Sequence, residues 1–207
     1  MIKNIPNFIS ILRVFLAPIF LLFFIYNYYL AAFLAFFVAT ITDALDGYIA
    51  RKYKLVSNFG SILDPLADKI LVLFAFLCIF VFQSKFIEQS NTSYLVNILL
   101  FFLVLRDIII TILRERFKKN NIILKAITIG KIKTSMQFIF IHLFLMEYLF
   151  QEIFPEGLNI KEIGIINLDA LFYLLLGILF LITLVLAALF SLISALQYIY
   201  KYKRIYK

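Results

Sequence analysis

Long apolar runs, each long enough to cross a bilayer, follow one another along most of this chain. A helix needs about 20 apolar residues to span the hydrocarbon core, and in lipid only helices and closed barrels satisfy every backbone polar group. With 64% hydrophobic residues among 207 and a mean hydropathy of +1.02, the composition lies outside that of soluble domains. We therefore expect an all-α, polytopic membrane protein, one domain over residues 1–207, with an N-terminal interfacial helix start at residues 4–13. The six expected spans are roughly 10–29, 31–50, 61–83, 94–113, 132–151 and 169–199.

The net charge of +8 is distributed unevenly between the two sides of these expected spans. Basic residues gather after the second and fourth spans and in the C-terminal tail: Arg51, Lys52, Lys54, Arg114, Arg116, Lys118, Lys119, Lys125, Lys131, Lys133, Lys201, Lys203, Arg204 and Lys207. The opposite connections hold Lys85 and Lys161 beside several glutamates. The positive-inside rule then predicts that both termini are cytoplasmic in the inner cell membrane. The basic residues therefore belong to topology and anionic ligands, and we expect no nucleic-acid partner.

Four carboxylates lie at the cytoplasmic ends of the second and third expected spans: Asp43, Asp46, Asp64 and Asp68. Each would cost roughly 2.5–3.5 kcal/mol inside a membrane helix if it stayed unpaired. Spacings of three and four residues place each pair on one helix face, and a short connection would make the two helices antiparallel neighbours whose acids converge. Mg²⁺ or Mn²⁺ would compensate such a cluster, because hard cations take carboxylate oxygens. The alternative is four separately solvated acids at the interface.

A carboxylate-bound divalent cation at a membrane face favours a phosphate-bearing substrate, because such cations bridge protein carboxylates and phosphate oxygens. Two neighbouring cations would stabilise both oxygens of an in-line displacement. A different class remains open, a divalent-cation transporter with these acids on its ion pathway. The position of all four acids toward one face speaks against transport, which needs a route through the membrane.

The same stretch carries a specific spacing, D-x2-D-G-x2-A-R-x8-G-x3-D-x3-D. It resembles the motif of the CDP-alcohol phosphatidyltransferases, and the matching residues are Asp43, Asp46, Gly47, Ala50, Arg51, Gly60, Asp64 and Asp68. Members of that family exchange the CMP of a CDP-linked lipid for an alcohol. The resemblance implies the family's membrane fold, a bilayer partner, a Mg²⁺ or Mn²⁺ cofactor and a homodimer.

The resemblance also implies a role for each matching residue. Asp43, Asp46 and Asp64 would hold the metal, with Asp68 sharing in ligation and acting as general base on the acceptor hydroxyl. The implied nucleotide-binding residues are Asp43, Gly47, Ala50, Arg51 and Gly60. The opening run from Asn4 to Arg13 is similar to the start of family members, and Arg13 either extends to lipid headgroups or reaches the substrate pyrophosphate.

A second group of residues bears on the acceptor. Arg106, Arg114, Lys131 and Lys133 converge toward one span end and would suit a phosphomonoester. The run Gly130-Lys-Ile-Lys-Thr-Ser-Met-Gln137 resembles the phosphatidylglycerophosphate synthase branch, which implies CDP-diacylglycerol as donor and glycerol 3-phosphate as acceptor. Phosphatidylglycerol (giving cardiolipin), serine and inositol phosphate remain open as acceptors. The lysines could instead serve topology alone, and Arg106 could simply pair with Asp107.

Overall fold

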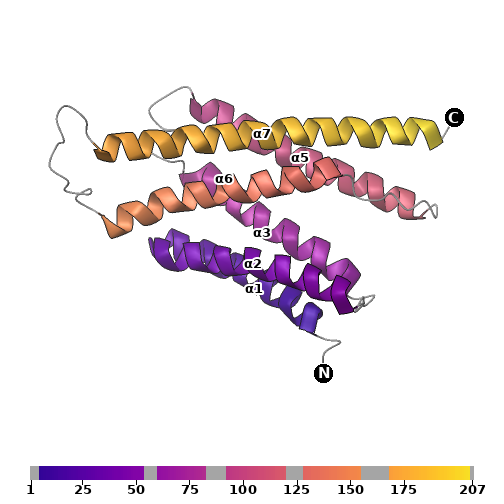
Figure 1. Cartoon of the computed structure of the whole chain (residues 1–207), viewed down its shortest axis with the longest axis horizontal. Coiled ribbons are helices and arrows are strands. Elements are labelled where there is room, and N and C mark those ends of the chain that lie inside the picture. Colours follow the sequence, from indigo (N-terminus) through magenta and orange to yellow (C-terminus); the bar gives the residue numbers. More distant parts are fainter. Residues whose placement is uncertain (1–4, 54–59, 83–91, 120–127, 155–167, 206–207) are drawn as a thin grey trace. The chain divides into compact units, whose positions relative to one another are not determined.

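Six helices make up the described part of the chain (Figure 1). The structure, a computed structural model, describes residues 5–53, 60–82, 92–119, 128–154 and 168–205. The side chains of 5–7, 44–53, 60–65, 92, 118–119, 128, 168–169 and 201–205 are outside that description. The helices are α1 (Ile5–Ile25), α2 (Tyr29–Tyr53), α3 (Gly60–Phe82), α5 (Thr92–Lys119), α6 (Thr128–Ile153) and α7 (Leu168–Ile205).

Each described helix corresponds to one expected span, and the differences lie at the ends. The expected interfacial start is not separate from the first span, because α1 runs unbroken from Ile5. Pro6 is tolerated there because the first-turn N–H groups have no intrahelical partner. At its other end α1 stops at Ile25, four residues before the expected boundary, because Asn27 adopts a left-handed φ of 62°. Asparagine tolerates this conformation, and hydropathy does not reveal it because the apolar run continues through the turn.

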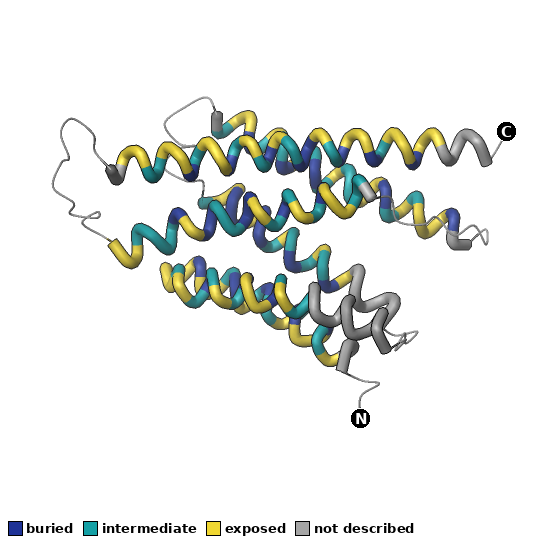
Figure 2. Tube along the Cα trace, in the orientation of Figure 1, coloured by how far each residue is buried: buried dark blue, intermediate teal, exposed yellow. Residues whose placement is uncertain are grey.

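The apolar character of the helices confirms a polytopic membrane protein. Three stretches of the described chain are long and apolar enough to cross a bilayer, Phe8–Ile25, Ser93–Phe117 and Ala170–Tyr200. A shorter apolar run, Tyr29–Asp43, lies in α2. Buried residues recur along α7 between exposed ones (Figure 2), and many of the exposed ones are large and apolar, such as Leu189 and Leu196. Lipid-facing surfaces have this composition.

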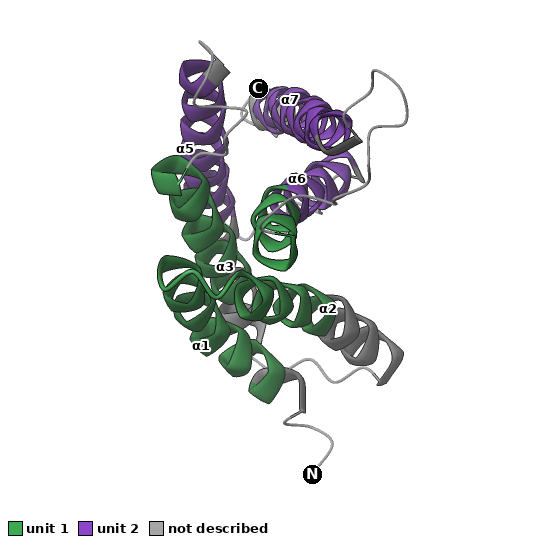
Figure 3. Cartoon of the chain, turned by 90° about the vertical axis from the view of Figure 1, so that its left-hand side faces the viewer, with its two compact units in different colours: residues 1–84, 144–169 green, residues 85–143, 170–207 purple. Residues whose placement is uncertain are grey.

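The chain forms two compact units (Figure 3). Unit 1 comprises Met1–Ser84 and Phe144–Asp169, and unit 2 comprises Lys85–Leu143 and Ala170–Lys207. Unit 1 therefore contains α1, α2, α3 and the end of α6, whereas unit 2 contains α5, the beginning of α6 and α7. The expectation of a single domain over residues 1–207 stays a prediction.

Aromatic rings fill the interior of unit 1. The fully buried ring of Phe24 lies 5.0–6.4 Å, centroid to centroid, from five others: Phe20, Tyr29, Phe82, Phe144 and Tyr148. Edge-to-face and offset pairs of this kind contribute about 0.5–1.5 kcal/mol each beyond their buried area. Phe24 thus joins α1 to α2, α3 and the end of α6.

The last turns of α6 also cap two other helices of unit 1. A carboxylate oxygen of Glu152 accepts a hydrogen bond from the Leu30 backbone N–H at 2.6 Å, in the first turn of α2. The Tyr148 hydroxyl donates to the backbone carbonyl of Phe82, the last residue of α3. Helix ends leave such N–H and C=O groups without intrahelical partners, and α6 supplies a partner for one group on each of these helices.

Candidate active site

Two of the four motif aspartates meet at one arginine from α1. Arg13 is fully buried, and its Nη1 lies 2.8 Å from Oδ1 of Asp43 on α2. The same nitrogen donates to Oδ1 of Asp68 on α3. The carboxylates are 31% and 41% exposed, so a ligand can still reach them. Two acids that are far apart in the chain therefore share one positive charge.

The buried arginine adds a third helix, α1, to the expected convergence of the acids. The expectation was direct packing of two antiparallel neighbours, the second and third spans. Within the described residues α1 packs along both α2 and α3. The facing ends of α2 and α3 at the motif lie outside the described side chains, so their direct packing stays a prediction. Arg13 supplies the charge that makes this convergence favourable. Its burial also excludes the alternative in which Arg13 extends to lipid headgroups.

The rest of the motif is described only as backbone. Asp46, Gly47, Ala50 and Arg51 lie on α2, while Gly60 begins α3 and Asp64 follows one turn later. Their side chains are outside the described residues, so their metal and nucleotide contacts stay predictions. Among the side chains that are described, no three metal-ligating groups gather in one place. The chemistry of the two described carboxylates still fits Mg²⁺ or Mn²⁺, because carboxylate oxygens are ligands of these cations and both side chains are partly exposed.

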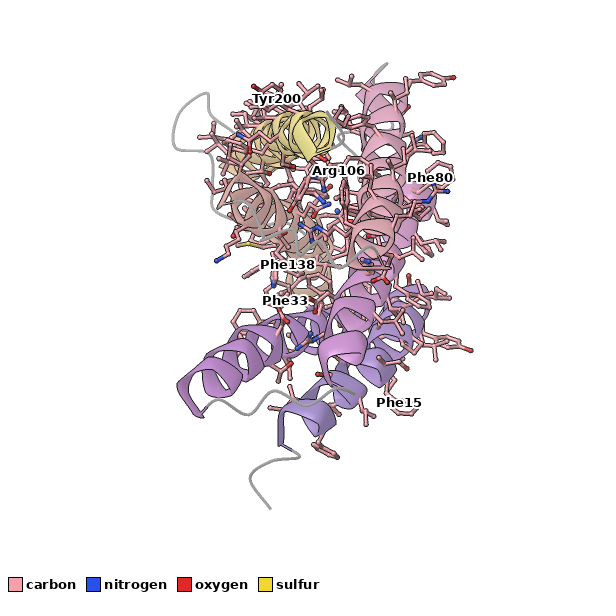
Figure 4. The ribbon with its side chains drawn as sticks, turned by 90° about the vertical axis from the view of Figure 1, so that its right-hand side faces the viewer. Phe15, Phe33, Phe80, Arg106, Phe138 and Tyr200 are labelled. Atoms are coloured by element: carbon pink, nitrogen blue, oxygen red, sulfur yellow. The ribbon has the colours of Figure 1, made fainter. Side chains whose placement is uncertain are left out.

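Unit 2 contains a second charged cluster, centred on Asp107 of α5. Arg106, labelled in Figure 4, places Nη1 3.0 Å from Oδ1 of Asp107. The buried Lys133 of α6 donates to the same oxygen, and Nε2 of Gln137 lies 3.4 Å from Oδ2. The expected pairing of Arg106 with Asp107 is therefore present, and it brings Lys133 to the same carboxylate.

Helix α7 completes this cluster. Nε of Arg106 donates to the Ser191 carbonyl oxygen at 3.2 Å, and its Nη2 donates to Oγ of Ser194. One turn further along α7, the Tyr198 hydroxyl accepts a hydrogen bond from Nη2 of Arg114, whose guanidinium carbon lies 4.8 Å from the Tyr198 ring centroid. The sequence interpretation missed these three α7 residues. The sequence does contain a pattern that could have indicated them, because their hydroxyl groups recur at intervals of about one turn in an otherwise apolar span.

The four predicted acceptor residues thus separate into different environments. Arg106 and Lys133 share Asp107, and the charges of Arg106 and Arg114 both act on Lys133. Lys131 is exposed. A Cβ at nearby Gly130 would meet no atom of the described structure within 4 Å.

Comparison with known proteins identifies the family. The sequence model of the CDP-alcohol phosphatidyltransferases matches residues 3–198. The chain belongs to this family. As a CDP-alcohol phosphatidyltransferase, it has the motif acids Asp43 and Asp68 together and a cationic cluster in unit 2.

Several curated members of the family are similar over much of this chain, and each of the following is named CDP-diacylglycerol–glycerol-3-phosphate 3-phosphatidyltransferase. The protein of Rickettsia typhi is 36% identical over 138 residues, covering 65% of this chain and 72% of that protein. That of Haemophilus influenzae is 41% identical over 115 residues, 54% of this chain and 58% of that protein. The protein of Wigglesworthia glossinidia brevipalpis is 34% identical over 171 residues, covering 80% of this chain and 85% of that protein.

Proposed function

We propose that this protein transfers the phosphatidyl group of CDP-diacylglycerol to glycerol 3-phosphate, giving phosphatidylglycerophosphate and CMP. Membership of the family supports the use of a CDP-linked donor. The names of its relatives support glycerol 3-phosphate as the acceptor. The convergence of Asp43 and Asp68 at Arg13 is the observation that carries the site assignment.

The charge of the unit 2 cluster favours a phosphomonoester acceptor. Arg106, Arg114 and Lys133 carry three positive charges and Asp107 one negative charge, which leaves a net charge of +2. A phosphomonoester carries about −1.5 to −2 at pH 7. Phosphatidylglycerol offers a phosphodiester with a single negative charge, and serine is zwitterionic without net charge. Glycerol 3-phosphate therefore complements the cluster better than either of these, whereas inositol phosphate shares its phosphomonoester.

The proposed chemistry begins with removal of a proton from the acceptor hydroxyl by the carboxylate of Asp68. The acceptor oxygen then forms a bond to the lipid-side phosphorus, and the bond from that phosphorus to the CMP oxygen breaks. Asp43, Asp46, Asp64 and Asp68 would hold Mg²⁺ or Mn²⁺, which when bound neutralises charge on the pyrophosphate. Arg13 keeps the two described carboxylates together, and Arg51 would contact the nucleotide along with Gly47, Ala50 and Gly60.

The cellular arrangement is part of the same proposal. Charge asymmetry supports a cytoplasmic location for both termini and for the motif acids. Cytoplasmic access would suit a reaction whose second substrate, glycerol 3-phosphate, is water-soluble. The family resemblance supports a homodimer.

The experiment that tests the reaction offers four acceptors to the purified protein with CDP-diacylglycerol and Mg²⁺. Glycerol 3-phosphate, phosphatidylglycerol, serine and inositol phosphate are supplied in parallel, and CMP release and lipid product are measured. We expect CMP release only with glycerol 3-phosphate. Turnover with a different acceptor in place of glycerol 3-phosphate would support a phosphatidyltransferase but overturn glycerol 3-phosphate as its acceptor. No CMP release with any acceptor, together with Mg²⁺ flux in proteoliposomes, would favour the transporter.

A further inference from the structure

One face of α7 carries hydroxyl groups where an apolar membrane helix would place aliphatic side chains. Ser191, Ser194 and Tyr198 follow one another at three and four residues, so they lie on one helix face. Ser191 and Ser194 are fully buried, and Tyr198 is 1% exposed. Polar groups inside a membrane helix are retained where they contact a partner across the helix interface.

The partners of this face are the two arginines assigned to the acceptor phosphate. Ser194 and the Ser191 carbonyl hold Arg106 through two different guanidinium nitrogens, Nη2 and Nε. Tyr198 holds Arg114 through its hydroxyl and through the face of its ring. A guanidinium group that makes several contacts at once can adopt few other orientations. Helix α7 therefore decides where the remaining N–H groups of both arginines point.

The Ser191 hydroxyl adds an observation that protein contacts do not explain. Its Oγ is buried and has no hydrogen-bond partner within the described part of the protein. A buried unpaired hydroxyl costs roughly 1–3 kcal/mol. This orphan group lies on the residue whose carbonyl binds Arg106, so the cluster has a polar position for a further partner such as a ligand oxygen or water.

We propose that α7 is a wall of the acceptor site, in which Ser194 and Tyr198 are positioning residues that orient Arg106 and Arg114 toward the acceptor phosphomonoester. This inference rests on the proposed function. An arginine side chain has about 2 kcal/mol of rotamer entropy to lose when it is ordered. If contacts with α7 already order the arginine before the phosphate binds, less of this entropy is lost on binding, and the affinity for the phosphate is higher. Helix α7 acts on acceptor affinity without touching the reacting atoms.

The test uses Ser194→Ala and Tyr198→Phe in the full-length protein. Each change removes one hydroxyl acceptor from an arginine, and Tyr198→Phe keeps the ring. We expect each variant to raise the KM for glycerol 3-phosphate about 5- to 10-fold, within the range for a lost hydrogen bond to a charged group. The kcat and the KM for CDP-diacylglycerol should change less than twofold. Calorimetric titration of glycerol 3-phosphate should show the same loss of affinity without turnover.

Matched controls come from the same helix. Thr183→Ala removes a hydroxyl that donates to carbonyls within α7, those of Leu179 and Phe180. Tyr200→Phe removes the hydroxyl of a tyrosine that is 72% exposed. Both controls should keep the wild-type KM for glycerol 3-phosphate. Equal effects in the controls and in the Ser194 and Tyr198 variants would overturn the inference.

A double-variant cycle separates positioning from general destabilisation. If Ser194 acts through Arg106, adding Ser194→Ala to Arg106→Ala should raise the KM no further. A fully additive effect, or an unchanged KM in both single variants, would overturn the positioning role and leave the proposed function intact. Failure of the wild-type protein to bind or turn over glycerol 3-phosphate would overturn the proposed function and this inference together.

Discussion

Arg13 carries one positive charge, whereas Asp43 and Asp68 together carry two negative charges when both are ionised. The described cluster is therefore short of positive charge even with its buried arginine. A divalent cation bound by these acids would make up the difference, and Arg13 would keep them together before it binds. At the residue scale, this guanidinium accounts for how two acids on separate helices remain close together.

Replacing Arg13 with glutamine should make the stability of the protein depend on divalent cations. Without the guanidinium the two carboxylates repel each other, and because both are partly exposed we expect a cost of about 1–2 kcal/mol rather than the full penalty of a buried pair. The melting temperature without metal should fall by roughly 2–8 °C. Mg²⁺ should restore most of that loss, so its stabilising effect should be larger in Arg13→Gln than in the wild type.

The control for this experiment is Arg116→Gln, the same substitution at an exposed position of α5. Its melting temperature should match the wild type with and without Mg²⁺. An equal Mg²⁺ effect in Arg13→Gln and in the wild type would show that Arg13 and the cation do not act on the same carboxylates.

Asp68→Asn tests the general base. Asparagine keeps the shape of the side chain but cannot accept the proton, and loss of a general base commonly costs 10²–10⁴-fold in rate. We expect kcat to fall by that amount at saturating Mg²⁺, while the affinity for CDP-diacylglycerol changes little. Asp43→Asn should instead weaken Mg²⁺ and nucleotide binding together. A near-wild-type rate in Asp68→Asn would exclude the base assignment.

At the scale of the helices, α5 and α6 each offer a pair of cations, one of which is exposed while the other is buried or half-buried. On α5 the half-buried Arg106 contacts Asp107, whereas Arg116 is exposed. On α6 the buried Lys133 contacts Asp107, whereas Lys131 is exposed. These pairs would separate the charge that we propose for the acceptor site from the topological charge that the positive-inside rule predicts.

Alanine substitutions within these pairs should therefore give unequal results. Arg106→Ala and Lys133→Ala should each raise the KM for glycerol 3-phosphate about 10- to 100-fold, because each removes a charge-assisted hydrogen bond to the phosphate. Lys131→Ala should have a smaller effect, and Arg116→Ala should have none. Steady-state kinetics with saturating CDP-diacylglycerol makes the measurement. An Arg116→Ala effect as large as that of Arg106→Ala would mean that the cluster acts only through general surface charge.

At the scale of the whole molecule, the orientation of the chain in the membrane decides which substrates can reach the acids. The charge pattern predicts that the connections near Lys85 and Glu156 lie outside the cell. Cysteines placed at Ser90 and Asn159, in a Cys78→Ala background, should react with an impermeant thiol reagent in intact cells. A cysteine at Lys125 should react only after permeabilisation. The reverse pattern would overturn the orientation and the cytoplasmic active site.

Local features of the chain were predictable from the sequence because they depend on neighbouring residues. Hydropathy over windows of one span predicted six helices, and all six are present in the described residues. The spacing of the motif indicated the family and placed its acids on two helices, as α2 and α3 confirm. The end of α1 was not predictable from hydropathy, because one left-handed asparagine interrupts a run that stays apolar.

The sequence by itself determined the membrane class, the helices and the chemistry of the donor groups, since periodicity and residue type act over short distances. Only the tertiary structure decided which charged and polar side chains contact one another. Arg13 and Asp68 are 55 residues apart, and Arg106 and Ser194 are 88 apart. A hydrogen bond forms only within about 3 Å, so partners this distant are fixed by how the helices pack. The packing of α1 assembles one cluster, and the contacts of α5 with α6 and α7 assemble the other.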